Sequence, residues 1–273
     1  MTFMEMLKNA WTVNNSLVCV GLDPDLKKMP ACVVEKKNPI FEFNKAIIDA
    51  TKDAVCCYKP QAAMYAGMNA DEELGMTIDY IHEVAPGIPV ILDAKRADIG
   101  NTTAMYAKEA FERYNADAVT VNPYMGMDAL KPFLDREDKG VIVLCRTSNG
   151  GAKEVQELRL ESGEMLYQHI ARLIATTWNY NKNTMLVAGA TYPEELGEIR
   201  KIVGDTPLLV PGIGAQGGDL AGVLKNGLTA NKTGLAINSS RGIIYASNGE
   251  DFAEAAGKAA KDAASGKFCK KLL

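Results

Sequence analysis

Residues 90–103 read VILDAKRADIGNTT, which begins with the pattern of a β-strand and ends with that of a helix start. A short apolar run of this kind is typical of a parallel strand buried on both faces. The charged residues Asp93, Lys95, Arg96 and Asp98 lie at the carboxyl end of this run. Charged groups are costly to remove from water unless they pair or serve a function. The stretch therefore predicts one strand-then-helix unit with a functional cluster at its strand end.

The same succession of strand and helix recurs along the chain. Strand patterns occupy eight segments, at 16–23, 54–60, 89–95, 117–123, 140–148, 184–190, 207–214 and 234–242. Amphipathic helix patterns lie between and after them, such as those at 40–54, 71–85, 103–115, 163–180 and 250–266. Eight such units predict an α/β fold, a (β/α)₈ TIM barrel formed as a single domain by residues 1–273. A doubly wound open sheet is the alternative, weakened because no GxGxxG follows the first strand.

The composition, net charge and cysteine spacing of the chain exclude several classes of protein. The 273 residues are 47% hydrophobic and 23% charged, as in an ordinary globular protein, and the net charge of -4 argues against a nucleic-acid binder. No segment approaches the roughly 18 apolar residues of a membrane span, and residues 1–15 lack a signal-peptide pattern. The six cysteines, without CxxC spacing, are expected to be reduced core residues of a cytoplasmic protein: Cys19, Cys32, Cys56, Cys57, Cys145 and Cys269.

The third strand carries the most specific cluster. Residues two apart point the same way in a strand, so Asp93 and Lys95 are expected to share a face at the barrel mouth. Asp98 lies three residues further, where the chain has left the strand. A lysine held beside carboxylates stays protonated and can act as a general acid. The alternative interpretation is a solvated group of ion pairs.

Two further charged residues end the first and second strands. Lys59 precedes Pro60, which lacks a backbone donor, so the strand should stop with Lys59 at the rim. Asp23 is also followed by a proline. Taken alone, Lys59 could be a rim lysine in water and Asp23 a residue that begins a turn.

Glycine-rich loops follow the last two strands. Residues 210–220 read VPGIGAQGGDL and residues 238–243 read NSSRGI. These loops form the usual phosphate site of such barrels, where glycines allow close backbone approach and Arg241 offers a forked donor. Ordinary turn glycines with a surface arginine are the alternative.

Histidine is scarce in this chain. His82 and His169 both fall inside helix patterns and are interpreted as structural. A Ser-His-Asp triad or a histidine-built metal site is therefore not expected, and the absence of GxxxxGK[ST] argues against a P-loop.

The stretch DAKRADIGNT, together with KPQ at 59–61 and LCRTSN at 144–149, resembles the orotidine 5′-phosphate decarboxylase family. Its D-x-K-R-x-D-I-G form is similar to the longer, divergent bacterial-type branch. The resemblance implies conversion of orotidine 5′-phosphate to UMP and CO₂, the last step of de novo UMP biosynthesis, without metal or cofactor. It also implies a homodimer whose active sites are shared across the interface.

The family's roles can be carried over residue by residue. Asp23 and Lys59 would bind the ribose, Asp93 would face the substrate carboxylate, and Lys95 would protonate C6 of the pyrimidine. Together with Lys59, Asp93 and Lys95, Asp98 would belong to the catalytic set. The remaining residues that the resemblance assigns to substrate binding are Ile99, Thr102, Ser148, Pro211, Gln216 and Arg241.

Within that set, the resemblance implies distinct positions. Asp98, Ile99 and Thr102 would reach the partner's site, and Ser148 would contact the pyrimidine. Gln216 and Arg241 would hold the phosphate.

Two other functions stay open on the sequence. A Mg²⁺-dependent relative, such as 3-keto-gulonate-phosphate decarboxylase or hexulose-phosphate synthase, shares D-x-K-x-x-D but needs an additional acid near the end of strand two. Lys59 occupies that point here, without a nearby acid in the sequence. A non-catalytic phosphate-binding barrel would keep the glycine loop and Arg241 but has no use for Asp93, Lys95 and Asp98 together.

Overall fold

The computed structural model describes residues 1–213 and 218–265. Its sheet has the strand order β2-β1-β8-β7-β6-β5-β4-β3, and all neighbouring pairs are parallel. The strands are β1 Val18–Leu22, β2 Cys57–Pro60, β3 Ile91–Arg96, β4 Ala118–Val121, β5 Gly140–Arg146, β6 Thr184–Ala188, β7 Leu208–Val210 and β8 Leu235–Ser239. Each falls within a segment predicted from the sequence, apart from the last residue of β3.

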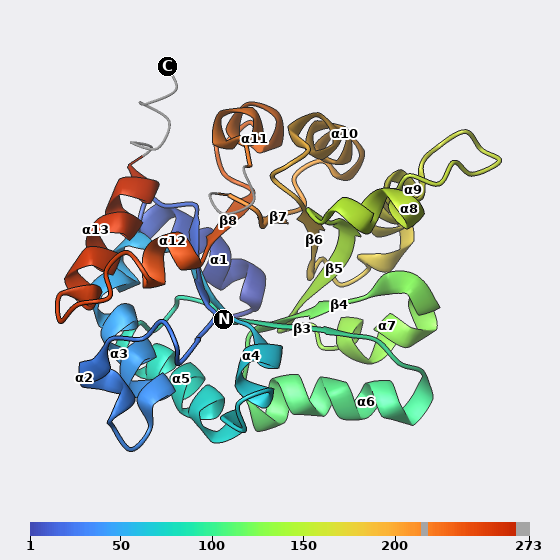
Figure 1. Cartoon of the computed structure of the whole chain (residues 1–273). Helices are drawn as coiled ribbons and strands as arrows, with labels where there is room; N and C mark the ends of the chain where they lie inside the picture. The colour runs from blue at the N-terminus through green and yellow to red at the C-terminus, as the bar shows by residue number, and fades with distance from the viewer. Residues whose placement is uncertain (214–217, 266–273) are drawn as a thin grey trace.

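The sheet closes into a barrel. β1 pairs with β8 on one side and with β2 on the other, so the first and last strands are neighbours. Parallel bridges join Tyr58 to Val90 and Gln61 to Asp93, linking β2 to β3. The strands thus form a nearly closed ring (Figure 1). The predicted (β/α)₈ barrel is confirmed, and the open-sheet alternative is wrong.

Helices surround the ring of strands (Figure 1). Two of them, α6 and α9, end in π-helical turns at Glu109–Arg113 and Ile174–Trp178. The α-helices are α1 Phe3–Val13, α2 Ala31–Val34, α3 Pro39–Thr51, α4 Ala62–Ala66, α5 Asp71–Val84, α6 Gly100–Lys108, α7 Met127–Leu134, α8 Lys153–Gln156, α9 Leu166–Leu173, α10 Pro193–Val203, α11 Leu220–Gly227, α12 Arg241–Ile244 and α13 Phe252–Ala264.

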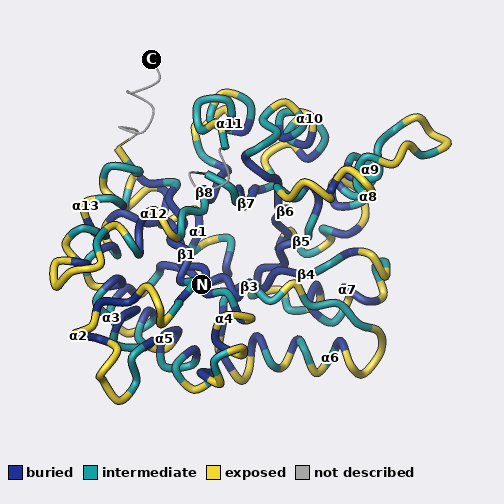
Figure 2. The backbone as a smooth tube through the Cα atoms, viewed as in Figure 1, coloured by how far each residue is buried: buried dark blue, intermediate teal, exposed yellow. Residues whose placement is uncertain are grey.

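The strands are buried along most of their length (Figure 2). Every residue of β1, β2, β4, β6 and β7 is buried, as expected for a parallel sheet covered by helices. β3 and β8 differ because their last residues are partly buried or, at Lys95, exposed. The core therefore opens at the carboxyl ends of these two strands.

Helix α1 was not anticipated from the repeat of strands and helices. Thr2 and Glu5 form a capping box at its start, which satisfies backbone donors of the first turn. Trp11 donates from Nε1 to the carbonyl of Leu235 at 2.9 Å, at the amino end of β8. A Cβ on Gly140, at the start of β5, would lie 2.3 Å from the Phe3 ring. Helix α1 thus packs against the amino ends of strands, away from the carboxyl ends.

The expectation that all six cysteines lie in the core is wrong for one of them. Cys32 is exposed, because α2 is a single helical turn in which only Val33 is buried. The buried free cysteines are Cys19, Cys56, Cys57 and Cys145, and Cys269 lies outside the described residues. Across residues 1–213 and 218–265, no helix combines the length and apolar character needed to cross a bilayer.

Candidate active site

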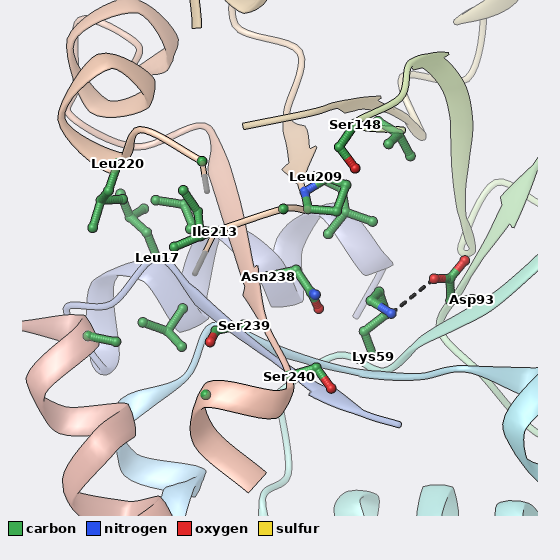
Figure 3. Close-up of a pocket in the computed structure, with 18 of the residues that line it drawn as sticks. Leu17, Lys59, Asp93, Ser148, Leu209, Ile213, Leu220, Asn238, Ser239 and Ser240 are labelled. Atoms are coloured by element: carbon green, nitrogen blue, oxygen red, sulfur yellow. Dashed lines mark hydrogen bonds and ion pairs between the residues drawn. The ribbon is translucent and has the colours of Figure 1, made fainter. Parts of the chain in front are cut away.

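A cavity of about 1160 Å³ lies at the carboxyl ends of the strands and extends past β1 and β8 to residues near their amino ends, such as Ser16 and Thr233. Its lining includes residues from the ends of β1, β2, β3, β5, β7 and β8 (Figure 3). The predicted residues that line it are Asp23, Lys59, Asp93, Lys95, Ser148, Pro211 and Arg241. Six separate strands, far apart in sequence, therefore bring the predicted side chains into one chamber.

Asp93 lies at the centre of the polar cluster. Its Oδ2 accepts hydrogen bonds from Lys59 Nζ at 2.9 Å and Gln61 Nε2 at 3.0 Å. Its Oδ1 accepts from Lys95 Nζ at 2.6 Å and Thr120 Oγ1 at 2.8 Å. An ionised carboxylate has about four lone-pair positions for acceptance. The carboxylate of Asp93 is thus surrounded by donors and held in one orientation.

The charges in this cluster balance. Lys59 and Lys95 carry two ammonium groups against the carboxylates of Asp93 and Asp23, and Lys59 Nζ lies 3.8 Å from Asp23 Oδ1. Burial raises the pKa of Asp93, but the charges of Lys59 and Lys95 outweigh it and hold that pKa well below its ordinary value. Asp93 is therefore a carboxylate at neutral pH.

Lys59 is buried and does not lie at a wet rim. Its side chain is 5% exposed, and β2 continues one residue past it to Pro60. Burial alone lowers the pKa of Lys59, yet the charges of Asp93 and Asp23 raise it above its ordinary value. Lys59 lies near the end of β2 as predicted, but the alternative of a rim lysine in water is wrong, because the side chain turns toward Asp93 inside the barrel (Figure 3). Lys59 therefore stays an ammonium within the protein.

The side chain of Lys95 contacts Asp93, as the alternation of the strand predicted, but the backbone conformation of Lys95 is unusual. Its φ is +48°, in the left-handed region that non-glycine residues avoid. The register of β3 against β4 also shifts between Leu92 and Arg96. The side chain of Lys95 is 46% exposed within the cavity region, compared with 9% for Asp93. The Lys95 ammonium is thus the accessible member of the cluster.

The opposite part of the cavity is suited to an anion. Arg241 begins α12 after β8, and Pro211 and Gly212 follow β7. Gly212 has a φ of +102°, which favours glycine at this turn. Among the described residues, no carboxylate forms an ion pair with Arg241. Gln216, predicted to hold phosphate, lies outside the described residues.

Ser148 is positioned by a buried arginine. Arg146, at the end of β5, is 1% exposed and pairs with Glu157 at 2.6 Å and with Glu195. Its guanidinium also lies 4.0 Å from the centre of the Tyr192 ring. These contacts anchor the chain two residues before Ser148 to the segments that carry α8 and α10.

Asp98, Ile99 and Thr102 do not join the cluster within this chain. Asp98 Oδ1 accepts from the backbone amide of Ile99 at 2.8 Å, and Ile99 is 59% exposed. None of the three belongs to the described lining of the cavity. The motif is therefore divided: Asp93 and Lys95 line the cavity, whereas Asp98 does not.

Two partners of Asp93 were not identified from the sequence. Gln61 appeared only as part of KPQ, and Thr120 lies within the apolar pattern of β4, so neither carried a signal of its own. Asn238 and Ser240 also line the cavity (Figure 3), and Ser240 Oγ is buried without a hydrogen-bond partner. A polar atom of this kind is available to a ligand.

The two histidines are engaged outside the cavity. His82 Nε2 lies 2.9 Å from Asp117 Oδ2, and His169 Nδ1 lies 2.8 Å from Glu164 Oε1. Within the described part of the chain, no three His, Cys, Asp or Glu side chains are grouped so as to hold a metal ion. The chemistry that the described cavity offers is an accessible ammonium next to a fixed carboxylate, with the Arg241 guanidinium elsewhere on the lining.

Comparisons with known proteins agree with this geometry. A family model described as orotidine 5′-phosphate decarboxylase / HUMPS family matches residues 16–256. The chain is 57% identical to orotidine 5′-phosphate decarboxylase from Dechloromonas aromatica, covering 94% of each protein. It is 55% identical to that from Ralstonia pickettii, covering 95% of this chain and 96% of the relative. The structure of Leishmania donovani OMP decarboxylase superposes with a TM-score of 0.84 at 36% identity, covering 100% of both chains.

Proposed function

The chain belongs to the orotidine 5′-phosphate decarboxylase / HUMPS family, and we propose that it converts orotidine 5′-phosphate to UMP and CO₂. This is the last step of de novo UMP biosynthesis. The observation that carries the proposal is the Lys95 ammonium, which lies 2.6 Å from the Asp93 carboxylate. Asp93 also pairs with Lys59, and Lys59 lies near Asp23, so the four side chains form one charge network.

Lys95 is the proposed proton donor. Loss of CO₂ breaks the bond to C6 and leaves an electron pair on that carbon. An ammonium nearby stabilises this charge and then transfers its proton to C6, which yields UMP and a neutral amine. Lys95 suits this role because its side chain is more accessible than that of Lys59, whose ammonium is enclosed by Asp93 and Asp23.

Asp93 is proposed to face the carboxylate that leaves. Two like charges about 4 Å apart interact by about 4 kcal/mol at an effective dielectric of about 20. Full relief of that repulsion in the transition state would accelerate the reaction by about a thousandfold. The charges of Lys59 and Lys95 keep Asp93 ionised against the effect of burial, and four donors leave its carboxylate unable to turn away from such a neighbour.

The rest of the substrate is assigned to the surrounding residues. Asp23 and Lys59 are proposed to bind the ribose, and Ser148 the pyrimidine. Arg241, without an ion pair among the described residues, is proposed to hold the phosphate, beside the turn at Pro211. Gln216 remains a proposed phosphate ligand outside the described residues. Binding energy from the phosphate can offset the repulsion at the reacting carboxylate.

The proposed reaction needs no metal. A Mg²⁺-dependent relative would place its cation near the end of β2, where Lys59 Nζ is already within 2.9 Å of Asp93 Oδ2. A second cation there would be repelled by this ammonium. The residue two positions on, Gln61, supplies an amide and not an additional acid. These contacts favour the metal-independent member of the family.

A homodimer with shared active sites is the second part of the proposal. Ile99 and Met105 on the segment of α6 are 59% and 62% exposed, and Tyr124 and Met125 after β4 are 84% and 47% exposed. The two segments are adjacent, because the amide of Asn122 donates to the carbonyl of Arg96 at 2.9 Å. Exposed apolar side chains grouped in this way are typical of an interface. A two-fold dimer through this face would carry Asp98, Ile99 and Thr102 toward the partner's cavity.

The proposed compartment is the cytoplasm. Buried free thiols, including the adjacent Cys56 and Cys57 with sulfur atoms 3.8 Å apart, support a reducing environment.

The test is the loss of orotidine 5′-phosphate absorbance with purified protein in excess EDTA. We expect turnover at the same rate with and without EDTA, and UMP as the product. Activity that EDTA abolishes and Mg²⁺ restores would support the metal-dependent relative instead. Binding of UMP without any turnover would favour the non-catalytic barrel.

A further inference from the structure

Thr120 lies between the two residues proposed to carry the chemistry. It belongs to β4, is 1% exposed, and its hydroxyl donates to Asp93 Oδ1 at 2.8 Å. The same oxygen accepts the backbone amide of Lys95 at 2.9 Å. One buried hydroxyl therefore contacts both the carboxylate of Asp93 and the main chain of Lys95.

The direction of these two hydrogen bonds is determined by chemistry. A threonine hydroxyl has one proton and two acceptor lone pairs. The amide of Lys95 can only donate, so it uses a lone pair of Thr120 Oγ1. Asp93 is ionised and can only accept, so the hydroxyl proton points at Oδ1. Neither bond can reverse while Asp93 stays charged.

The bond to the amide fixes a costly backbone conformation. Lys95 has a φ of +48°. For a residue with a Cβ, the left-handed region is sterically unfavourable. The register shift between β3 and β4 at this point removes regular ladder pairing for Lys95. The hydroxyl of Thr120 takes the place of a ladder partner for this amide.

The bond to Asp93 matters most when Lys95 acts. Oδ2 is held by Lys59 and Gln61, which lie in and directly after β2. Oδ1 is held by Lys95 Nζ and Thr120. A lysine that transfers its proton becomes a neutral amine, so its hydrogen bond to Oδ1 loses the assistance of the positive charge, while the hydrogen bond from Thr120 is unchanged.

We propose that Thr120 is a positioning residue for the decarboxylation. Its hydroxyl holds the main chain of Lys95 in the conformation that directs the ammonium into the cavity. It also keeps Asp93 in place when Lys95 gives up its proton. This inference rests on the proposed function, in which Lys95 is the proton donor.

The test compares Thr120→Val with Thr120→Ser and with a matched control. Valine keeps the branched shape without the hydroxyl, and serine keeps the hydroxyl without the methyl group. Thr184→Val is the control, because Thr184 is fully buried in β6 and its Oγ1 has no hydrogen-bond partner. Thr120→Ala is a second variant without the hydroxyl, in case the valine variant does not fold.

The kinetics should separate the variants that keep the Thr120 hydroxyl from those that lack it. In Thr120→Val, kcat should fall by about 10- to 100-fold, because small misplacements of reacting groups have effects of this size. KM and UMP binding should change little, since the proposed phosphate and ribose ligands are other residues. Thr120→Ser should restore most of the lost kcat, and Thr184→Val should behave as wild type.

Hydrogen–deuterium exchange of the Lys95 amide gives a readout independent of activity. Exchange should be faster in Thr120→Val and Thr120→Ala than in wild type or Thr120→Ser, because the acceptor is gone. An unchanged exchange rate, or a kcat loss no larger than that of Thr184→Val, would overturn the role of Thr120. An inactive wild type with the expected exchange pattern would instead refute the proposed function.

Discussion

Replacing Lys59 with methionine tests the energetics of the charge network. The Lys59 side chain is 5% exposed, with Nζ 2.9 Å from Asp93 Oδ2 and 3.8 Å from Asp23 Oδ1. Methionine is unbranched and apolar and occupies similar space, so the change removes the charge without opening a large cavity. Asp93 then keeps Lys95 as a charged partner.

The expected cost follows from the distance and the burial. At 2.9 Å and an effective dielectric of about 20, Lys59 and Asp93 attract each other by about 6 kcal/mol. Part of this is offset, because the variant no longer buries an ammonium. Removing one partner of a buried pair typically costs about 3–5 kcal/mol. We expect the free energy of unfolding of Lys59→Met to fall by about that amount at neutral pH.

The pH dependence has a definite sign. The folded-state pKa of Asp93 is depressed, because Lys59 and Lys95 outweigh the effect of burial. Asp93 therefore contributes stability that is present above its unfolded pKa of about 3.9 and lost as the pH falls below it. Without Lys59 the folded pKa rises, so the acid-unfolding transition should move to higher pH.

Urea unfolding at fixed protein concentration measures the change, with Lys131→Met as the control. Lys131 pairs with Asp135 at 2.8 Å, but their side chains are 59% and 47% exposed. Solvent screens such a pair, and its loss should cost under about 1 kcal/mol. Equal effects of the two substitutions, or an unmoved acid transition in Lys59→Met, would refute the buried-network reasoning.

Three further predictions concern the substrate and the dimer. Arg241→Ala should raise KM for orotidine 5′-phosphate and lower kcat/KM, but leave the poor turnover of orotidine, which has no phosphate, unchanged; equal losses on both would indicate a structural role. Gly189→Ala should raise KM, because its Cβ would lie 2.9 Å from the Ser148 backbone; unaltered kinetics would remove Ser148 from the pyrimidine site. Refolding an equal mixture of Lys95→Ala and Asp98→Asn subunits should recover about a quarter of wild-type activity, since half the dimers are mixed and each has one intact site. Mixed dimers without activity would place Asp98 in its own subunit's site.

The barrel was predictable because its signal is repeated. Apolar runs such as 140–146, each followed by a helix pattern, recur at every unit, so an error in one would not change the fold. Helix α1 escaped prediction because it precedes the first strand and stands outside the repeat. Cys32 was misplaced because one short helical turn carries no periodicity that separates an inner from an outer face.

The candidate site was predictable where charged residues lie at the carboxyl end of a strand. Asp93 and Lys95 stood out because charged residues there are unusual, whereas Thr120 looked like any β-branched strand residue. The left-handed backbone of Lys95 could not be anticipated, since lysine has no preference for it and the hydrogen bond that accompanies it is made to Thr120 on another strand. The burial of Lys59 was missed because the depth of a side chain depends on strands distant in sequence.

The role of Lys95 as proton donor is tested most directly by the turnover of Lys95→Ala, measured together with the affinity of this variant for UMP. With Lys95 as the proton donor, decarboxylation should fall below detection in this variant, while calorimetry should still show UMP binding, because the proposed phosphate and ribose ligands remain in place. A variant that kept more than about a tenth of wild-type kcat would have lost less than about 1.4 kcal/mol of transition-state stabilisation. That result would contradict the assignment of Lys95 as the proton donor.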